Sequence, residues 1–228
     1  YKQSLAIKPD YARAHYQMGV TFEVLKRYEE AIAAFQKAVQ YEPQNVRTHY
    51  RLGEVLKTVS RLPEAEAQLK RSLTVDPKYS QSMVSLGNLY VSQKRFPEAI
   101  AQFTSAIAIK ADFADSHLGL GNAYYNDKKW LESIPHYKKA TELSPNWPTG
   151  HLYLADAYLN SKQYNTAIPV YQKAIALDPK LADAYLGLGL TYVNLRNKPE
   201  AQKQLTVLNK LDVEKAAKLE SNMAVLKP

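Results

Sequence analysis

The chain has 228 residues, of which 46% are hydrophobic and 23% are charged. These values are ordinary for folded proteins, so they exclude a chain that stays disordered for lack of apolar side chains. No apolar run approaches the roughly 20 residues of a transmembrane helix, and the absence of cysteine excludes disulfides and thiolate metal sites without choosing a compartment.

The formal net charge of +8 raises the question of nucleic-acid binding. Basic residues are spread along the whole chain, with the largest local excess in residues 46–79. A nucleic-acid-binding protein concentrates lysine and arginine on one face, often with aromatic side chains between them. We therefore expect no nucleic-acid partner.

The sequence repeats itself every 34 residues. Residues 86–90 read Leu-Gly-Asn-Leu-Tyr, and residues 120–124 read Leu-Gly-Asn-Ala-Tyr. Each repeat holds two stretches of about a dozen residues with apolar side chains three or four apart, separated by a short polar turn such as residues 126–129. This spacing predicts two helices per repeat, joined as a hairpin.

In chain order, residues 1–11 are expected to form the end of a preceding, truncated repeat, with Pro9 stopping its helix. Six full repeats follow, at residues 12–45, 46–79, 80–113, 114–147, 148–181 and 182–215. Residues 213–228 carry Ala216, Leu219, Met223 and Leu226 at helical spacing. This tail predicts a C-terminal capping helix, which covers the last apolar face.

Small and bulky residues recur at fixed positions of the repeat. In the first helices of the repeats, one position always holds a small residue: Gly19, Gly53, Gly87, Gly121, Ala155 and Gly189. In the second helices, another position does so: Ala31, Ala65, Ala99, Ser133, Ala167 and Ala201. A bulky column supplies apolar mass: Phe35, Leu69, Phe103, Tyr137, Tyr171 and Leu205. Glycine inside a helix costs up to about 1 kcal/mol relative to alanine, so the glycine column predicts a close approach of two helices.

With this period, these columns and prolines at the repeat ends, the chain resembles the tetratricopeptide repeat family over its whole length. The resemblance implies an all-α fold, a right-handed superhelical solenoid of helical hairpins. The chain departs from the family pattern at Ala111, where a proline is expected, and at Ser133, where an alanine is expected. Pro135 and Pro169 fall inside second helices and are expected to bend or loosen their first turns.

In this family the first helices line a concave groove, so the resemblance also implies which residues form a binding surface. The expected groove residues are Arg13, Tyr16, Arg47, Tyr50, Lys57, Val84, Asn88, Leu118, Asn122, Tyr125, Leu152, Asp156, Leu159, Leu186 and Leu190. The first two repeats contribute basic and tyrosine side chains, and the later repeats contribute mainly aliphatic ones.

The groove chemistry predicts a protein partner that presents a peptide segment or an amphipathic helix. Its apolar side chains would lie over Leu118, Leu152 and Leu186, and its acidic side chains near the basic end. Asn88, Asn122 and Asp156 form a polar ladder suited to holding peptide amides and carbonyls. The alternative is that neighbouring helices or the chain's own tail already cover part of this surface.

Four histidines fall in one column, His15, His49, His117 and His151. Equivalent residues of successive repeats lie about 8–10 Å apart, too far to share an ion that needs nitrogens at about 2.0–2.1 Å. We interpret the column as packing between hairpins and expect no metal site. His136 lies off this column and is expected at the surface.

No glycine-rich phosphate loop and no nucleophile elbow appears in the sequence, so we expect neither an enzyme nor a cofactor. The sequence predicts a protein-interaction scaffold. Two alternatives stay open: a self-assembling module that stacks through its uncapped N-terminal face, and an accessory array of a larger enzyme or secretion complex.

Overall fold

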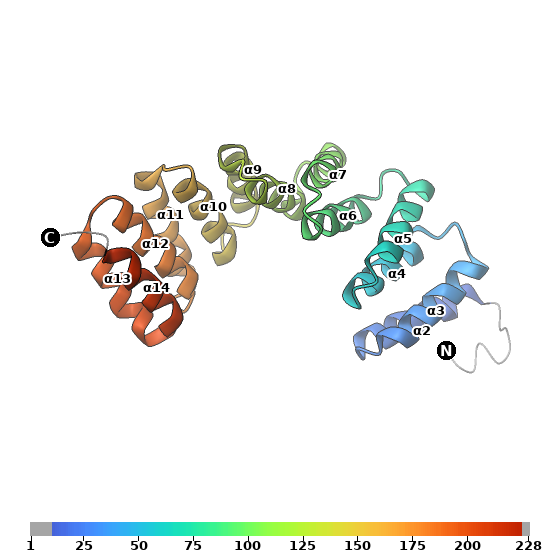
Figure 1. The fold of residues 1–228 in the computed structure, drawn as a ribbon. Helices are drawn as coiled ribbons and strands as arrows, with labels where there is room; N and C mark the ends of the chain where they lie inside the picture. Colours follow the sequence, from blue (N-terminus) through green and yellow to red (C-terminus); the bar gives the residue numbers. More distant parts are fainter. Residues whose placement is uncertain (1–10, 225–228) are drawn as a thin grey trace. The chain divides into compact units, whose positions relative to one another are not determined.

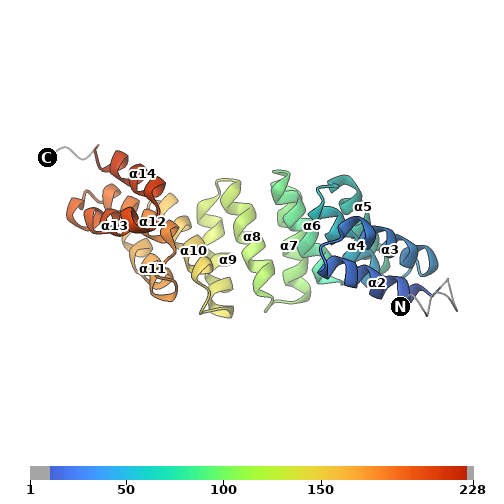
Figure 2. The same ribbon diagram turned by 90° about the horizontal axis from the view of Figure 1, so that it is seen from below.

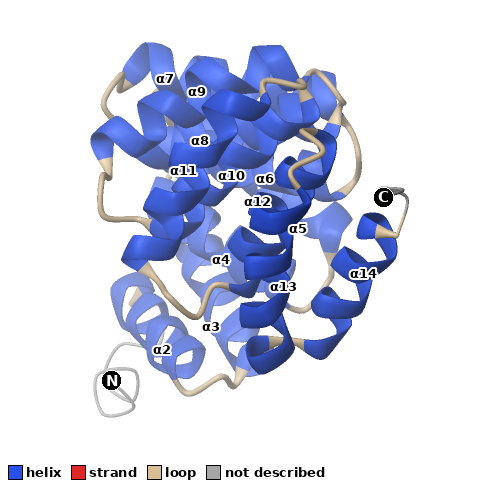
Figure 3. Cartoon of the chain, turned by 90° about the vertical axis from the view of Figure 1, so that its left-hand side faces the viewer, coloured by secondary structure: helices blue, strands red, loops and turns tan. Residues whose placement is uncertain are grey.

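A computed structural model of the chain describes residues 11–224, and over these residues the regular structure is entirely helical (Figure 3). The helix end predicted within residues 1–10, and Leu226 of the predicted cap, lie outside the described residues. The chain divides into two compact units, residues 1–111 and residues 112–228, which are treated in turn.

Within its described residues, 11–111, the first unit consists of three helical hairpins (Figure 1). Their helices are α2 (Ala12–Val24), α3 (Tyr28–Tyr41), α4 (Val46–Thr58), α5 (Leu62–Val75), α6 (Ser80–Ser92) and α7 (Phe96–Ile109). Helix α3 packs against α4, and α5 packs against α6. Leu52 and Leu56 of α4 are buried in one cluster with Phe35 of α3, so neighbouring hairpins share a core that neither could form alone.

The second unit contains three hairpins and one further helix. Its helices are α8 (Ala114–Asn126), α9 (Trp130–Leu143), α10 (Pro148–Asn160), α11 (Tyr164–Leu177), α12 (Ala182–Asn194), α13 (Lys198–Leu211) and α14 (Val213–Met223). Helix α14 packs against both α12 and α13 (Figure 2). Its Ala216, Leu219 and Met223 are buried, and it caps the last hairpin.

Each hairpin reverses direction over three residues through one backbone position with positive φ. In the fourth hairpin this residue is Lys128, with φ of 61°. The Lys128 N–H donates to the Tyr125 carbonyl at 3.0 Å, and the Lys129 N–H donates to the Tyr124 carbonyl at 2.9 Å. These bonds satisfy carbonyls that the end of α8 would leave free. A lysine at this place also puts a positive charge at the negative end of the helix dipole.

The glycine column lies directly against the bulky column. A Cβ atom built on Gly87 would lie 2.6 Å from Cζ of Phe103, and one on Gly121 would lie 2.6 Å from Cδ1 of Tyr137. These distances leave no room for a methyl group. The predicted close approach of the two helices is therefore confirmed.

The fifth hairpin solves the same packing problem differently. In α10 the position of the glycine column is held by Ala155. The room for the Tyr171 ring comes instead from Gly187 on α12. A Cβ atom on Gly187 would lie 2.4 Å from Cε1 of that ring. The column residue of the sixth hairpin, Gly189, faces the cap instead, because its Cβ atom would lie 2.5 Å from Cδ2 of Leu219.

The two internal prolines do not interrupt their helices. Helix α9 runs through Pro135 and α11 runs through Pro169, and both keep the 14-residue length of α7. Each proline stands at the sixth residue of its helix, where it removes one backbone donor. The hydrogen bonds on either side of it continue the helix.

The histidine column has the packing role that its spacing predicts. Nε2 of His49 donates to the carbonyl of Pro43 at 2.9 Å, and Nε2 of His151 donates to that of Pro145 at 2.9 Å. Each ring therefore ties the start of a first helix to the proline that ends the preceding helix. His15 instead stacks on Tyr41, with ring centroids 5.5 Å apart.

The expectation that His136 lies exposed at the surface is wrong. Its ring is half-buried and stacks on Tyr124, with centroids 5.5 Å apart, and His117 lies 6.2 Å away. Burial and the neighbouring His117 lower the pKa of His136. The rings that cover it come from α8, so the spacing within α9 carries no sign of them.

Because Gly121 touches the Tyr137 ring, Gly121→Ala should overpack the fourth hairpin. We expect a loss of about 1–3 kcal/mol in the free energy of unfolding, measured by urea denaturation. In an unobstructed helix the same change stabilises by up to about 1 kcal/mol, so the sign of the effect is diagnostic. A stabilised variant would contradict the close contact.

Candidate functional site

In the first unit, the first helices border a hollow of about 350 Å³. Its lining is Arg13, Tyr16, Gln17, Glu42, Asn45 and Arg47, so three predicted groove residues come together here. Both arginines are exposed, and neither forms an ion pair within residues 11–224. Two unpaired guanidinium groups beside a tyrosine make this hollow suited to a carboxylate.

The local structure around this hollow is set by a helix cap. Asn45 precedes α4, and its side-chain oxygen accepts a hydrogen bond from the Thr48 N–H at 3.1 Å. The amide of the same side chain donates to Glu42 at 3.1 Å. This cap fixes the start of α4, and Arg47 is the second residue of that helix.

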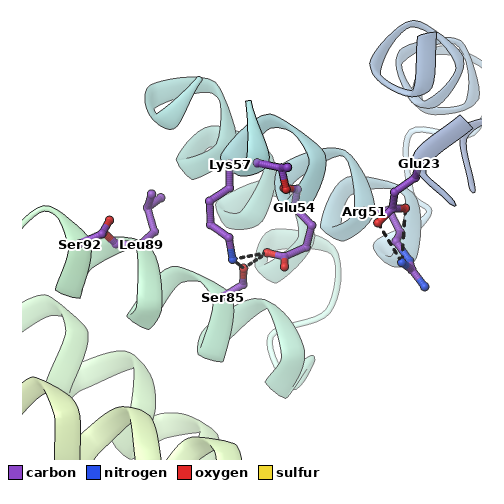
Figure 4. A network of polar contacts seen from close by, with 8 residues as sticks. Glu23, Arg51, Glu54, Lys57, Ser85, Leu89 and Ser92 are labelled. Atoms are coloured by element: carbon purple, nitrogen blue, oxygen red, sulfur yellow. Dashed lines mark hydrogen bonds and ion pairs between the residues drawn. The ribbon is translucent and has the colours of Figure 1, made fainter. Parts of the chain in front are cut away.

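Polar contacts between neighbouring first helices occupy the middle of the first unit (Figure 4). Nη1 of Arg51 lies 3.3 Å and 3.4 Å from the two carboxylate oxygens of Glu23. Nζ of Lys57 donates to Glu54 at 2.8 Å and to the hydroxyl of Ser85 at 3.0 Å, and Ser85 in turn donates to Glu54. Lys57, one of the predicted groove residues, forms an ion pair with Glu54 that compensates its charge.

The other groove residues of the first unit differ in exposure. Tyr50 is half-buried, edge-on to Tyr79 at 5.6 Å, and burial, with Glu54 adding to it, raises the pKa of Tyr50 to about 12. Val84 is half-buried, and Asn88 is exposed.

In the second unit, the faces of α10 and α12 border a larger hollow of about 500 Å³. Its lining is Tyr125, Thr149, Leu152, Tyr153, Asp156, Leu159, Asn160, Leu181, Asp183, Leu186, Gly187, Leu190 and Lys218. Six predicted groove residues are among them: Tyr125, Leu152, Asp156, Leu159, Leu186 and Leu190. Leu118 and Asn122 lie outside this lining and are half-buried.

The leucines of this hollow divide into a floor and a wall. Leu152 and Leu186 are only 6% and 8% exposed and belong to the core of the unit. Leu159 and Leu190 are half-buried and pack against that core, so a ligand can reach them. Sequence reasoning missed Tyr153, Asn160, Leu181, Gly187 and Lys218. The second glycine of α12 was a visible signal, whereas Lys218 reaches the hollow only because α14 folds back.

Two members of the predicted polar ladder are already hydrogen-bonded within the chain. Oδ1 of Asn122 accepts from the Tyr137 hydroxyl at 2.8 Å, and Oδ1 of Asp156 accepts from the Tyr171 hydroxyl at 2.6 Å. Asn88 follows Gly87, which packs against Phe103, a residue without a hydroxyl group. The bulky column thus decides which ladder side chains are engaged.

Asp156 has the most perturbed carboxyl group of the hollow. Burial raises its pKa to about 6, the nearby Asp183 adds to the rise, and the Tyr171 hydrogen bond opposes it. Tyr125 lies beside it, with its hydroxyl accepting from Nδ2 of Asn160 at 2.8 Å. Burial, together with Asp156, raises the pKa of Tyr125 to about 12.

Because the folded state raises the pKa of Asp156, it holds this proton to a higher pH than the unfolded chain does. The contribution of the Asp156 carboxyl group to the stability of the wild-type chain is therefore lost as the pH rises from about 4 to about 6. At pH 7, Asp156→Asn should raise the free energy of unfolding by about 1–2 kcal/mol, after allowance for partial solvation. At pH 4 the variant and the wild type should have the same free energy of unfolding. Urea denaturation at both pH values measures this.

A matched control is Asp183→Asn. Asp183 lines the same hollow but is exposed and pairs with Nζ of Lys215 at 3.3 Å, so its removal should bring no such gain. If Asp156→Asn and the wild type had the same free energy of unfolding at pH 7, the prediction that burial of the Asp156 carboxylate destabilises the chain would be wrong.

Sequence models of one repeat family match much of the chain. The model described as "TPR repeat" matches residues 87–128 and 155–195. Models described as "Tetratricopeptide repeat" match residues 12–45 and 114–147. No curated protein sequence matches the chain. No helix within residues 11–224 has the length and apolar character needed to cross a membrane.

Several solved structures share the fold. PilF of Pseudomonas aeruginosa superposes with a TM-score of 0.78 at 19% identity, covering 92% of this chain and 96% of that one. PilW, described as a type IV pilus biogenesis factor, gives 0.77 at 18% identity over 87% and 92%. YrrB, described as having an unusual peptide-binding site, gives 0.72 at 22% identity over 82% and 98%.

Proposed function

Because this chain belongs to the tetratricopeptide repeat family, whose fold serves protein–protein interaction, we propose that its first helices bind a peptide segment of a partner protein. The observation that carries the proposal is the 500 Å³ hollow of the second unit, where aliphatic and polar side chains line one concave surface. Such a surface is typical of ligand sites. Proteins of this family are generally scaffolds, not catalysts.

The two hollows suit different kinds of ligand side chain. In the first unit, exposed Arg13 and Arg47 suit acidic side chains or a terminal carboxylate. In the second unit, Leu159 and Leu190 suit the aliphatic part of a ligand side chain, with the buried Leu152 and Leu186 beneath them. YrrB, which has the same fold, is described as having a peptide-binding site, and this supports the proposal that the present chain binds a peptide.

The test starts from a phage-displayed library of random dodecapeptides selected on the intact chain. Selected peptides should be enriched in acidic residues and in residues with a long aliphatic side chain or stem. In fluorescence anisotropy, the double variant Arg13→Glu, Arg47→Glu should weaken peptides with acidic residues about tenfold, because it replaces attraction by repulsion. Leu190→Arg should weaken peptides with aliphatic residues.

The matched control is Arg71→Glu on the second helix α5. Arg71 is exposed and forms no ion pair within residues 11–224, so this variant changes the net charge in the same way as one groove arginine does. It should bind like the wild type. Unchanged affinity in the double variant and in Leu190→Arg, with unchanged circular dichroism, would move peptide binding away from these faces.

Self-assembly through the face of the first hairpin is a second candidate, favoured by one observation. A hollow of about 270 Å³ on α2 and α3 is lined by Met18, Phe22 and Ala34, among others. Met18 and Phe22 hold the repeat positions at which Leu52 and Leu56 pack against α3. This face therefore suits another helical hairpin, such as that of a second copy.

Light scattering at several concentrations tests self-assembly. We expect the average mass to rise with concentration and Phe22→Glu to abolish the rise, because a buried charge would oppose helix packing. A constant monomer mass at all concentrations would refute this candidate.

A further inference from the structure

We infer that the hollow of the second unit selects a basic side chain, lysine or arginine, with Asp156 as its counter-ion. The inference rests on the proposed function, because it names the ligand chemistry of the same peptide site. It places an aliphatic stem along the leucine wall and an ammonium or guanidinium group at the carboxylate.

The chain contains its own comparison for Asp156. In the fourth hairpin, Asn122 accepts the Tyr137 hydroxyl at 2.8 Å, and in the fifth, Asp156 accepts the Tyr171 hydroxyl at 2.6 Å. The two side chains stand at the same repeat position and make the same bond. A neutral amide is therefore sufficient for the structural role, and the negative charge of Asp156 has no part in it.

That charge carries a cost. A carboxylate at the side of an aliphatic hollow loses hydration, and the Tyr171 hydrogen bond replaces only part of it. The raised pKa of Asp156 is consistent with this loss. Within residues 11–224, Oδ2 of Asp156 receives no hydrogen bond, so one oxygen remains available to a ligand. Costly charges of this kind are concentrated at functional sites.

None of the charged groups around Asp156 within the described chain forms an ion pair with its carboxylate. Tyr171 from α11 and Tyr125 from α8 contribute hydroxyl groups. Asp183 from α12 pairs with Lys215, and Lys218 from α14 lines the hollow with its side chain exposed. No ion pair to Asp156 forms within the described chain. A ligand cation would complete the pair.

The leucines set the shape of the ligand. Leu159 and Leu190 are half-buried beside the floor made by Leu152 and Leu186. Lysine and arginine have flexible methylene stems that cover apolar surface while their charged heads reach a polar group. A glutamate or aspartate would bring its charge against Asp156, and a purely aliphatic residue would leave Asp156 desolvated without a partner.

The experiment uses small probes on the intact chain at pH 7, read by ¹H–¹⁵N NMR titration. Hexylammonium should shift the side-chain amide of Asn160 and the backbone amides of Gly187 and Leu190. The uncharged 1-hexanol should bind at least fivefold more weakly. Asp156→Asn should lower the affinity for hexylammonium at least fivefold and leave that for 1-hexanol unchanged, and lowering the pH to 5 should weaken hexylammonium binding to the wild type.

Asp183→Asn is the matched control, because it removes the same charge from the same hollow. It should change the hexylammonium affinity less than twofold. Equal binding of hexylammonium and 1-hexanol, or equal binding to the wild type and Asp156→Asn, would overturn the inference. The conservative Asn variant keeps the Tyr171 bond, as Asn122 does with Tyr137, so loss of folding would not explain a loss of binding.

Peptides separate this inference from the proposed function. In a selected peptide, replacing lysine by norleucine keeps the stem and removes the charge, and should cost at least fivefold in affinity. If norleucine peptides bind the hollow equally well, the choice of a basic residue fails and peptide binding stands. If hexylammonium binds as expected but no peptide is selected, the proposed function fails and the cation site stands.

Discussion

The contact between one small and one bulky residue controls the structure of this protein. In the fourth hairpin the Tyr137 ring lies on Gly121, so close that a methyl group would not fit. The ring then reaches the residue that follows the glycine, and its hydroxyl donates to Asn122. Packing of the core and polarity of the binding surface are therefore coupled, because one tyrosine serves both.

The same coupling produces the unusual carboxylate of the second unit. Tyr171 is fully buried, and Gly187 of the next first helix makes room for its ring. Its hydroxyl meets Asp156 where the preceding hairpin has Asn122. An asparagine would satisfy this hydroxyl at lower cost. The charge at this position is therefore best explained by a ligand, and the protein gives up stability at a site suited to binding.

The first unit handles charge in the opposite way. Glu23 pairs with Arg51, and Glu54 pairs with Lys57, so the middle of its first helices is internally compensated. The Glu23–Arg51 pair and the hydrogen bonds of Ser85 with Glu54 and Lys57 join neighbouring hairpins and add polar contacts to the shared apolar core. Arg13 and Arg47 stand outside this network and keep exposed guanidinium groups at one hollow. Electrostatic attraction for an acidic ligand is thereby confined to one end of the unit.

The sequence by itself determined the helical hairpins, the repeat family, the close approach of two helices at the glycine column and the helix face expected for each candidate residue, because a 34-residue period fixes these locally. Only the tertiary structure decided which side chains are already engaged. Lys57 is paired with Glu54, Leu152 is nearly covered, and His136 is stacked beneath Tyr124. The physical reason is that the period of the sequence places a residue on one face of its helix, whereas its contact partners come from other helices. Which of these partners a side chain meets depends on how the helices pack.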